Sequence, residues 1–151
     1  MAGPDQEPVS SAAATTPAPS AAVVLPKTSE SEQLLKIRHS MSHVMAMAVQ
    51  QLFPKARVTI GPWTETGFYY DFDNPDPFTE ADLKAIKKGM IKIINKKLPL
   101  ERVEVSRSEA KAKIQAQNEP YKLEILEGLQ EPITLYTLGE DWWDLCAGHA
   151  F

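Results

Sequence analysis

The first strong pattern in the chain is a set of apolar residues at the spacing of one helical face. It lies between residues 31 and 53 and includes Leu34, Leu35, Val44, Met45, Ala48 and Leu52. Pro54 follows directly, and proline ends helices because it has no backbone N–H to donate. The pattern therefore predicts one long helix over residues 31–53.

The following segment has the alternation that is typical of strands. Residues 57–63 and 67–73 predict two strands, joined by a turn over residues 64–67. In the second strand three aromatic side chains share one face: Phe68, Tyr70 and Phe72. We expect a hairpin whose aromatic face is the inner one.

Helical and extended segments alternate through the rest of the chain. Capping or first-turn residues predict where three helices begin: Thr79 with Asp82, Ser106 with Glu109 as a capping box, and Pro120. The buried face of the first is predicted to comprise Leu83, Ile86, Met90, Ile93 and Ile94, and Gly128 is expected to close the last. Residues 100–105 and 133–138 predict strands. An antiparallel sheet with packed helices, an α+β fold, is the class that these elements favour.

Residues 1–30 differ in composition from the rest of the chain. They are rich in Ala, Ser and Thr and hold five of the twelve prolines, namely Pro4, Pro8, Pro17, Pro19 and Pro26. So little apolar surface does not offset the entropy of ordering, and we expect a disordered leader before a domain at 31–151. The composition suggests an organelle transit peptide, whereas Asp5, Glu7 and the lack of Arg argue against one.

Charge and composition exclude several classes of protein. Lys and Arg number 16 against 20 Asp and Glu, so the net charge is −4 and no overall basic field exists for nucleic acid. This balance is still compatible with a local basic patch. No apolar run reaches the length of a membrane span, so we expect no membrane partner. With Cys146 as its single cysteine, the chain forms no internal disulfide.

The histidines and the cysteine fall into two short clusters. His39 and His43 are four residues apart, which places both imidazoles on one face of the first helix. Cys146 and His149 lie close together near the other end of the chain. Together they suit either a tetrahedral zinc site or a polar pocket that positions a water and an ester. Taken singly, each also fits a buried structural residue.

Several short strings then resemble the editing domain of threonyl-tRNA synthetases of the cyanobacterial and plastid type. They run in the same order as in that family: HSMSH at 39–43, IGP at 60–62, GFYYD at 67–71, EPYK at 119–122 and WDLC at 143–146. The resemblance covers about residues 31–148. Alanyl-tRNA synthetase editing domains share the two-histidine, cysteine-and-histidine framework and are more distant relatives.

The resemblance implies hydrolysis of serine wrongly esterified to threonine tRNA, with the 3′ end of that tRNA as partner. Position by position it implies catalytic roles for His39, His43, Lys122 and Cys146, and substrate binding by Tyr70 and Asp144. The histidines would contact the terminal adenosine or order the attacking water. Lys122 would hold ester or phosphate oxygens, and Asp144 would bind the seryl amine. No cofactor is required on this reading, although zinc on His39, His43 and Cys146 is the alternative.

The chain departs from the family pattern at its end. The family motif reads Cys-x-Gly-Pro-His, whereas here His149 follows Gly148 directly, so its match to the last family histidine is doubtful. We expect a truncated domain, incomplete at its C-terminus, without an ATP site and without aminoacylation. An inactive remnant, or a tRNA- or zinc-binding module, is the competing hypothesis. The plastid-type resemblance suggests chloroplast or mitochondrion, with cytoplasm as the alternative, and the oligomeric state is open.

Overall fold

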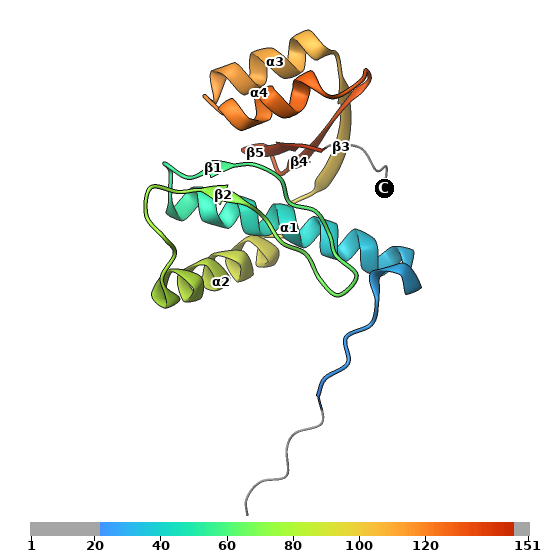
Figure 1. Ribbon diagram of the computed structural model, residues 1–151, viewed down its shortest axis with the longest axis vertical. Helices are drawn as coiled ribbons and strands as arrows, with labels where there is room; N and C mark the ends of the chain where they lie inside the picture. The colour runs from blue at the N-terminus through green and yellow to red at the C-terminus, as the bar shows by residue number, and fades with distance from the viewer. Residues whose placement is uncertain (1–21, 147–151) are drawn as a thin grey trace, which may run out of the picture.

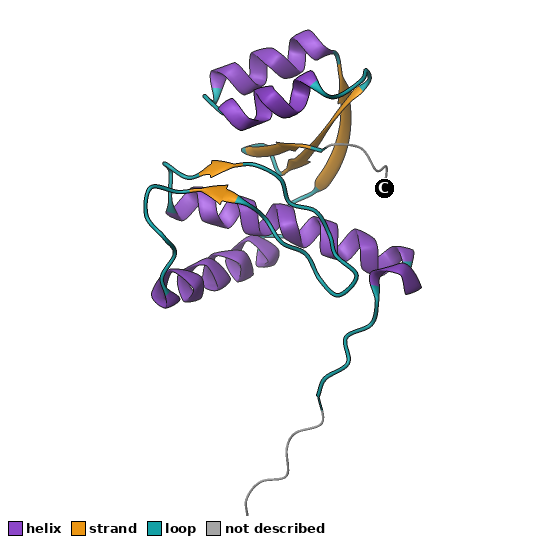
Figure 2. Ribbon diagram, in the orientation of Figure 1, coloured by secondary structure: helices purple, strands orange, loops and turns teal. Residues whose placement is uncertain are grey.

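The computed structural model describes residues 22–146, which form the predicted α+β fold. Its elements occur in this order: η1 (Thr28–Glu30), α1 (Glu32–Leu52), β1 (Arg57–Val58), β2 (Phe72–Asp73), α2 (Glu80–Asn95), β3 (Leu100–Val105), α3 (Arg107–Ala116), α4 (Pro120–Glu127), β4 (Ile133–Leu138) and β5 (Trp142–Leu145). The three-stranded sheet lies between two helical pairs, with α3 and α4 on one side and α1 and α2 on the other (Figure 1). Figure 2 shows the β1/β2 hairpin running beside α1.

The sheet is antiparallel throughout, in the order β3-β4-β5, and its side chains alternate between the two helical layers. Leu138 and Trp142 pack into the core formed with α1 and α2. Leu135, Trp143 and Leu145 pack into the separate core beneath α3 and α4. Because helices cover both faces, β4 and β5 each contribute side chains to both cores.

The first helix begins and ends where the sequence predicts. Ser31 caps α1, since its hydroxyl accepts a hydrogen bond from the backbone N–H of Leu34 at 3.3 Å. Folded structure starts before residue 31, however, because η1 precedes the helix and Thr28 is buried. The leader expected over residues 1–30 is therefore too long at its C-terminal end, and its residues 1–21 lie outside the described range.

A buried arginine joins this N-terminal segment to the tip of the hairpin. The guanidinium of Arg38 donates hydrogen bonds to the carbonyl of Pro26 at 2.7 Å, the hydroxyl of Thr28 at 2.6 Å and the carbonyl of Glu65 at 3.0 Å. Thr28 also donates its backbone N–H to the Glu65 carbonyl at 2.7 Å. The clasp formed by Arg38, Pro26, Thr28 and Glu65 fixes the hairpin turn against α1.

The hairpin is present, but regular pairing is shorter than predicted. Strands β1 and β2 pair over only two residues each, followed by separate hydrogen bonds as far as the turn. Pro62 has no N–H to donate, which interrupts the ladder. Gly61 permits the ring of Tyr70 to lie directly against the backbone, where a Cβ would overlap it. The aromatic face is the inner one as predicted, with Tyr70 buried and Tyr69 exposed.

The second helix buries a narrower face than the sequence predicts. The capping box of Thr79 and Asp82 is present, and Ile86 and Ile93 are buried. Leu83 and Ile94, which were expected on the buried face, are 57% and 46% exposed. The prediction is wrong at these two positions because α2 packs mainly against α1 and so covers only one stripe.

Helices α3 and α4 and strand β5 are the remaining elements to compare with the sequence predictions. Ser106 caps α3 by accepting a hydrogen bond from the Glu109 N–H, which is one of the two bonds of a capping box. Pro120 begins α4 and Gly128 ends it, as predicted. Strand β5 was not predicted. Among residues 22–146, no helix is long and apolar enough to cross a membrane.

Candidate functional site

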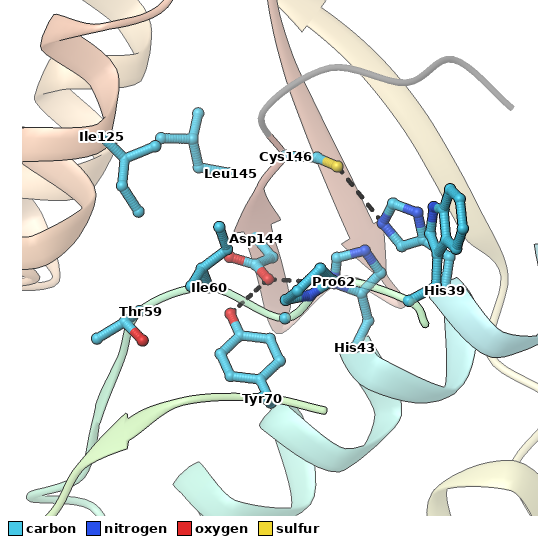
Figure 3. A pocket seen from close by; sticks show the side chains of 12 residues that line it. His39, His43, Thr59, Ile60, Pro62, Tyr70, Ile125, Asp144, Leu145 and Cys146 are labelled. Atoms are coloured by element: carbon cyan, nitrogen blue, oxygen red, sulfur yellow. Dashed lines mark hydrogen bonds and ion pairs between the residues drawn. The ribbon is translucent and has the colours of Figure 1, made fainter. Parts of the chain in front are cut away.

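The predicted site residues converge between α1, the hairpin and β5. His39 and His43 project from α1, Tyr70 comes from the hairpin, Asp144 lies on β5 and Cys146 directly follows that strand (Figure 3). These side chains come from segments about 100 residues apart, such as His43 and Asp144. The fold therefore brings together residues that the sequence shows only as separate motifs.

Asp144 lies at the centre of this group and is 3% exposed. One carboxylate oxygen, Oδ2, accepts a hydrogen bond from the hydroxyl of Tyr70 at 2.7 Å and lies 3.1 Å from Nδ1 of His43. The other oxygen, Oδ1, lies 3.4 Å from the ammonium of Lys122. Because a carboxylate only accepts, Nδ1 of His43 carries the proton in this contact. Its Nε2 is buried, with no hydrogen-bond partner among the described residues.

The second histidine meets the cysteine. Nε2 of His39 lies 3.4 Å from Sγ of Cys146, and the ring centroids of His39 and His43 are 4.7 Å apart. The ring of Tyr136 lies beneath both imidazoles, with centroids 5.4 Å from each. Aromatic packing therefore fixes the orientation of the histidine pair.

Lys122 lies behind Asp144 and is only 1% exposed. Its ammonium lies 4.6 Å from the ring centroid of Trp143 and 5.9 Å from that of Trp142. A cation without water needs such partners, and the carboxylate and the two indole faces supply them. In this position Lys122 does not line the cavity at the site.

Burial and neighbouring charges together shift the pKa values of Asp144, His39 and Tyr70. Burial alone raises the pKa of Asp144, but Lys122 and His43, with the Tyr70 hydroxyl, outweigh it and lower that pKa to about 2. Burial, reinforced by His43 and partly offset by Asp144, lowers the pKa of His39 to about 4. Burial, and then the Asp144 charge, raise the pKa of Tyr70 well above its usual value. At neutral pH the site thus holds an ionised carboxylate beside a neutral His39 and a neutral phenol.

A cavity of about 260 Å³ opens onto these groups. Its polar side is formed by His39, His43, Tyr70, Asp144 and Cys146. Its apolar side is formed by Ile60, Gly61, Pro62 and Trp63 of the hairpin and by Ile125 and Leu145, with Thr59 at the margin. The volume is below that of a typical drug-sized pocket, so the cavity suits a small polar group such as an amino acid.

Known proteins show what kind of chain carries this site. The chain is 93% identical over 148 residues to "Threonine--tRNA ligase" of Synechococcus sp. (strain CC9605) and 92% identical over 148 residues to that of Parasynechococcus marenigrum (strain WH8102). The chain belongs to the threonine--tRNA ligase family. Each match covers 98% of this chain and 24% of the relative, so the chain spans about a quarter of the length of the curated relatives it matches.

The threonine--tRNA ligase of Synechococcus elongatus (strain ATCC 33912 / PCC 7942 / FACHB-805) is 77% identical over 127 residues, which is 84% of this chain. No protein-family model matches the chain. The predicted resemblance to threonyl-tRNA synthetases is confirmed by these relatives.

In this member of the threonine--tRNA ligase family, six of the seven predicted site residues lie together: His39, His43, Tyr70, Lys122, Asp144 and Cys146. His149 lies outside the described residues. Sequence reasoning missed Tyr136, which supports both imidazoles, and the hairpin residues that wall the cavity. The IGP string at 60–62 was a signal for this wall, since it belonged to the resemblance.

The depressed pKa of His39 predicts how the stability of this threonine--tRNA ligase segment depends on pH. The pKa is 6.5 in the unfolded chain and about 4 in the folded one, so between these values the unfolded state binds more protons. The free energy of unfolding should therefore fall as the pH drops from 6.5 to about 4, by about 2 kcal/mol after allowance for solvent screening. Urea unfolding at several pH values measures this. His39→Gln should remove that part of the slope, and an unchanged slope would contradict the prediction.

Proposed function

We propose that this site hydrolyses the ester between serine and the 3′ end of threonine tRNA. One observation carries the proposal: a buried, ionised Asp144 lies at the inner side of a small cavity, beside His43 whose Nε2 is unpartnered among the described residues. A seryl ester supplies the complement to both groups, an ammonium for the carboxylate and a carbonyl for an activated water. The name of the relatives, threonine--tRNA ligase, supports tRNA as the partner.

The chemistry follows from the tautomer of His43. Since Nδ1 donates to Asp144 at 3.1 Å, Nε2 holds the lone pair that accepts a proton from water. The water oxygen then forms a bond to the ester carbonyl, and the bond to the ribose oxygen breaks. The proton held at Nε2 passes to that oxygen, which leaves as the 3′-terminal hydroxyl. Asp144 stabilises the imidazolium while the proton is on the ring.

Hydrolysis of this kind compensates for the limited ability of a binding site to distinguish threonine from serine. An aminoacylation site that binds threonine gains only about 1–3 kcal/mol of binding free energy from the extra methyl group. Such a site therefore rejects serine poorly. A second site that cleaves the seryl ester removes the error. The cavity of about 260 Å³ accommodates the small seryl group against the apolar hairpin wall.

Two of the predicted catalytic residues take indirect roles in this proposal. Lys122 keeps Asp144 ionised from behind, since its ammonium lies 3.4 Å from Oδ1 and it does not line the cavity. To hold ester or phosphate oxygens, as the sequence predicts, it would have to leave this position. Cys146 orients His39 through the 3.4 Å contact between Sγ and Nε2.

A zinc-dependent hydrolase is the second candidate, and one observation favours it. His39, His43 and Cys146 each offer a ligand atom, and these atoms all lie within 4.8 Å of one another. Asp144 binds the other ring nitrogen of His43, as carboxylates do for zinc-bound histidines. Two nitrogens and one sulfur fit zinc, with a fourth position left for water or substrate. When bound, zinc would polarise the carbonyl or lower the pKa of water.

Serine release from seryl-tRNA by the purified chain tests both candidates. We expect release well above the uncatalysed rate, and a loss of about 10²-fold in His43→Gln because the proton acceptor is removed. Gln51→Asn, an exposed change on the same helix, is the matched control and should leave the rate unchanged.

Metal analysis of the same preparation separates the two chemistries. Full activity in chelator-treated, metal-free protein supports the histidine mechanism and ends the zinc candidate. If activity is lost when the metal is removed and is restored by one equivalent of zinc, the zinc-dependent hydrolase is supported and the metal-free histidine mechanism is ruled out. No release above the uncatalysed rate under either condition would show that the proposed function is wrong.

A further inference from the structure

A second cavity lies on the other side of the two histidines. It has a volume of about 230 Å³ and is lined by Lys36, His39, Ser40, His43, Leu100, Arg102 and Tyr136. His39 and His43 also line the first cavity. The two cavities therefore adjoin at the imidazoles of His39 and His43.

The charged side chains that line the two cavities have opposite sign, and the strand pairing explains their placement. Arg102 of β3 is paired with Tyr136 of β4, and Tyr136 is paired with Asp144 of β5. Residues paired across antiparallel strands share one face, so the three side chains form a row on the face turned to α1. Neighbouring strands are about 4.8 Å apart, which places the Arg102 and Asp144 backbones about 10 Å apart. At one end of this row Asp144 places a negative charge at the first cavity, and at the other end Arg102 places a positive charge at the second.

A second cation reinforces this charge. Lys36 lies one helical turn before Ser40, whose hydroxyl donates to the Lys36 carbonyl at 2.7 Å. The Lys36 ammonium contacts Glu32 at 3.1 Å, and the Arg102 guanidinium contacts Glu104 at 3.3 Å. The lysine side chain is 48% exposed and the arginine side chain 35%. Exposed ion pairs of this kind contribute little to stability, so both cations can exchange a carboxylate for a phosphate.

We propose that this second cavity binds the phosphodiester that precedes the terminal nucleotide of the RNA, through Lys36 and Arg102. The inference rests on the proposed function, because the ester must lie at the imidazoles. An aminoacyl ester of an RNA has an ammonium on one side of the scissile bond and a phosphodiester on the other. Asp144 would bind the ammonium, and Lys36 and Arg102 would bind the phosphodiester. Tyr136 and Leu100 would contact the nucleoside between them. The phosphate contact sets the register of the ester at His43.

Binding of an uncharged RNA oligonucleotide ending in CCA to the full chain tests the site without any hydrolysis. We expect the double variant Lys36→Gln/Arg102→Gln to bind it about tenfold more weakly, with the slope of log affinity against log salt reduced by about one. The matched control is Lys87→Gln/Lys88→Gln, which removes the same charge from an exposed face of α2. Unchanged binding in the first variant, or an equal loss in the control, would overturn the proposal.

A comparison of two ester substrates separates this inference from the proposed function. The Lys36/Arg102 variant should release serine more slowly from the seryl-RNA oligonucleotide but at the unchanged rate from seryl-adenosine, which has no phosphate. An equal loss on both substrates would show a general distortion and overturn the proposal. If the unsubstituted chain hydrolyses neither ester but shows the binding difference, the proposed function fails and the phosphate site stands.

Discussion

Asp144→Asn is expected to slow serine release by about 10³-fold and to lower the free energy of unfolding by about 3–5 kcal/mol. The carboxylate contacts Tyr70, His43 and Lys122 at once. An amide of the same shape leaves the Lys122 ammonium buried without a counter-charge. It also removes the anion that would bind the seryl amine in the proposed function and that keeps the proton of His43 on Nδ1. Urea unfolding and single-turnover deacylation measure the two losses.

A second substitution separates the loss of stability from the loss of chemistry. Adding Lys122→Met to Asp144→Asn removes the unpaired cation, so most of the stability should return while the activity stays low. Asp141→Asn, an exposed change next to β5, is the matched control and should alter neither quantity. Recovery of activity together with stability in the double variant would show that Asp144 acts only in folding.

Gly61→Ala is expected to lower the rate by about 10²-fold although position 61 carries no reactive group. A Cβ at this position would overlap two ring atoms of Tyr70 and lie 2.9 Å from its Cγ. The ring is stacked on Phe72, with centroids 4.9 Å apart, so it does not yield without disturbing the core. The displacement would draw the hydroxyl away from Asp144 and cost about 1–3 kcal/mol of stability.

The cause of this effect is testable with neighbouring variants. Gly67→Ala, on the same hairpin, meets only Thr64 Oγ1 at 3.9 Å and should behave like the unsubstituted chain. Adding Tyr70→Leu to Gly61→Ala removes the overlapping ring and should restore stability, with activity at the level of Tyr70→Leu alone. Deacylation and thermal unfolding of the four variants check this, and a fully active Gly61→Ala protein would show that the ring adapts freely.

The local elements could be predicted because their signals lie within a few residues. The Ser31 and Thr79 caps, Pro120 and Gly128 mark helix ends whatever the rest of the chain does. The errors occur where distant packing decides. Leu83 and Ile94 satisfy a helical pattern but meet no partner layer within residues 22–146, so they remain exposed there.

Strand β5 was missed for a related physical reason. Its four residues, Trp142–Leu145, are all buried, so they show no alternation of apolar and polar residues. The same strand carries Asp144, whose importance could not be derived from its local sequence. Its contacts come from α1, the hairpin and α4. The histidine pair was evident from spacing alone, whereas Tyr70, Lys122 and Asp144 depended on the family resemblance.

The Arg38 clasp connects the N-terminal segment to the hairpin that forms part of the cavity wall. Pro26 and Thr28 are fastened through one guanidinium to Glu65, at the end of the hairpin that carries Ile60 to Trp63. Trimming the chain at residue 31, where the helical pattern begins, would therefore untie the hairpin from α1. Proteolysis or a fused tag near residue 26 would disturb the same hydrogen bonds between Arg38 and the N-terminal segment. For protein engineering, a shortened chain that keeps this contact has to begin before Pro26.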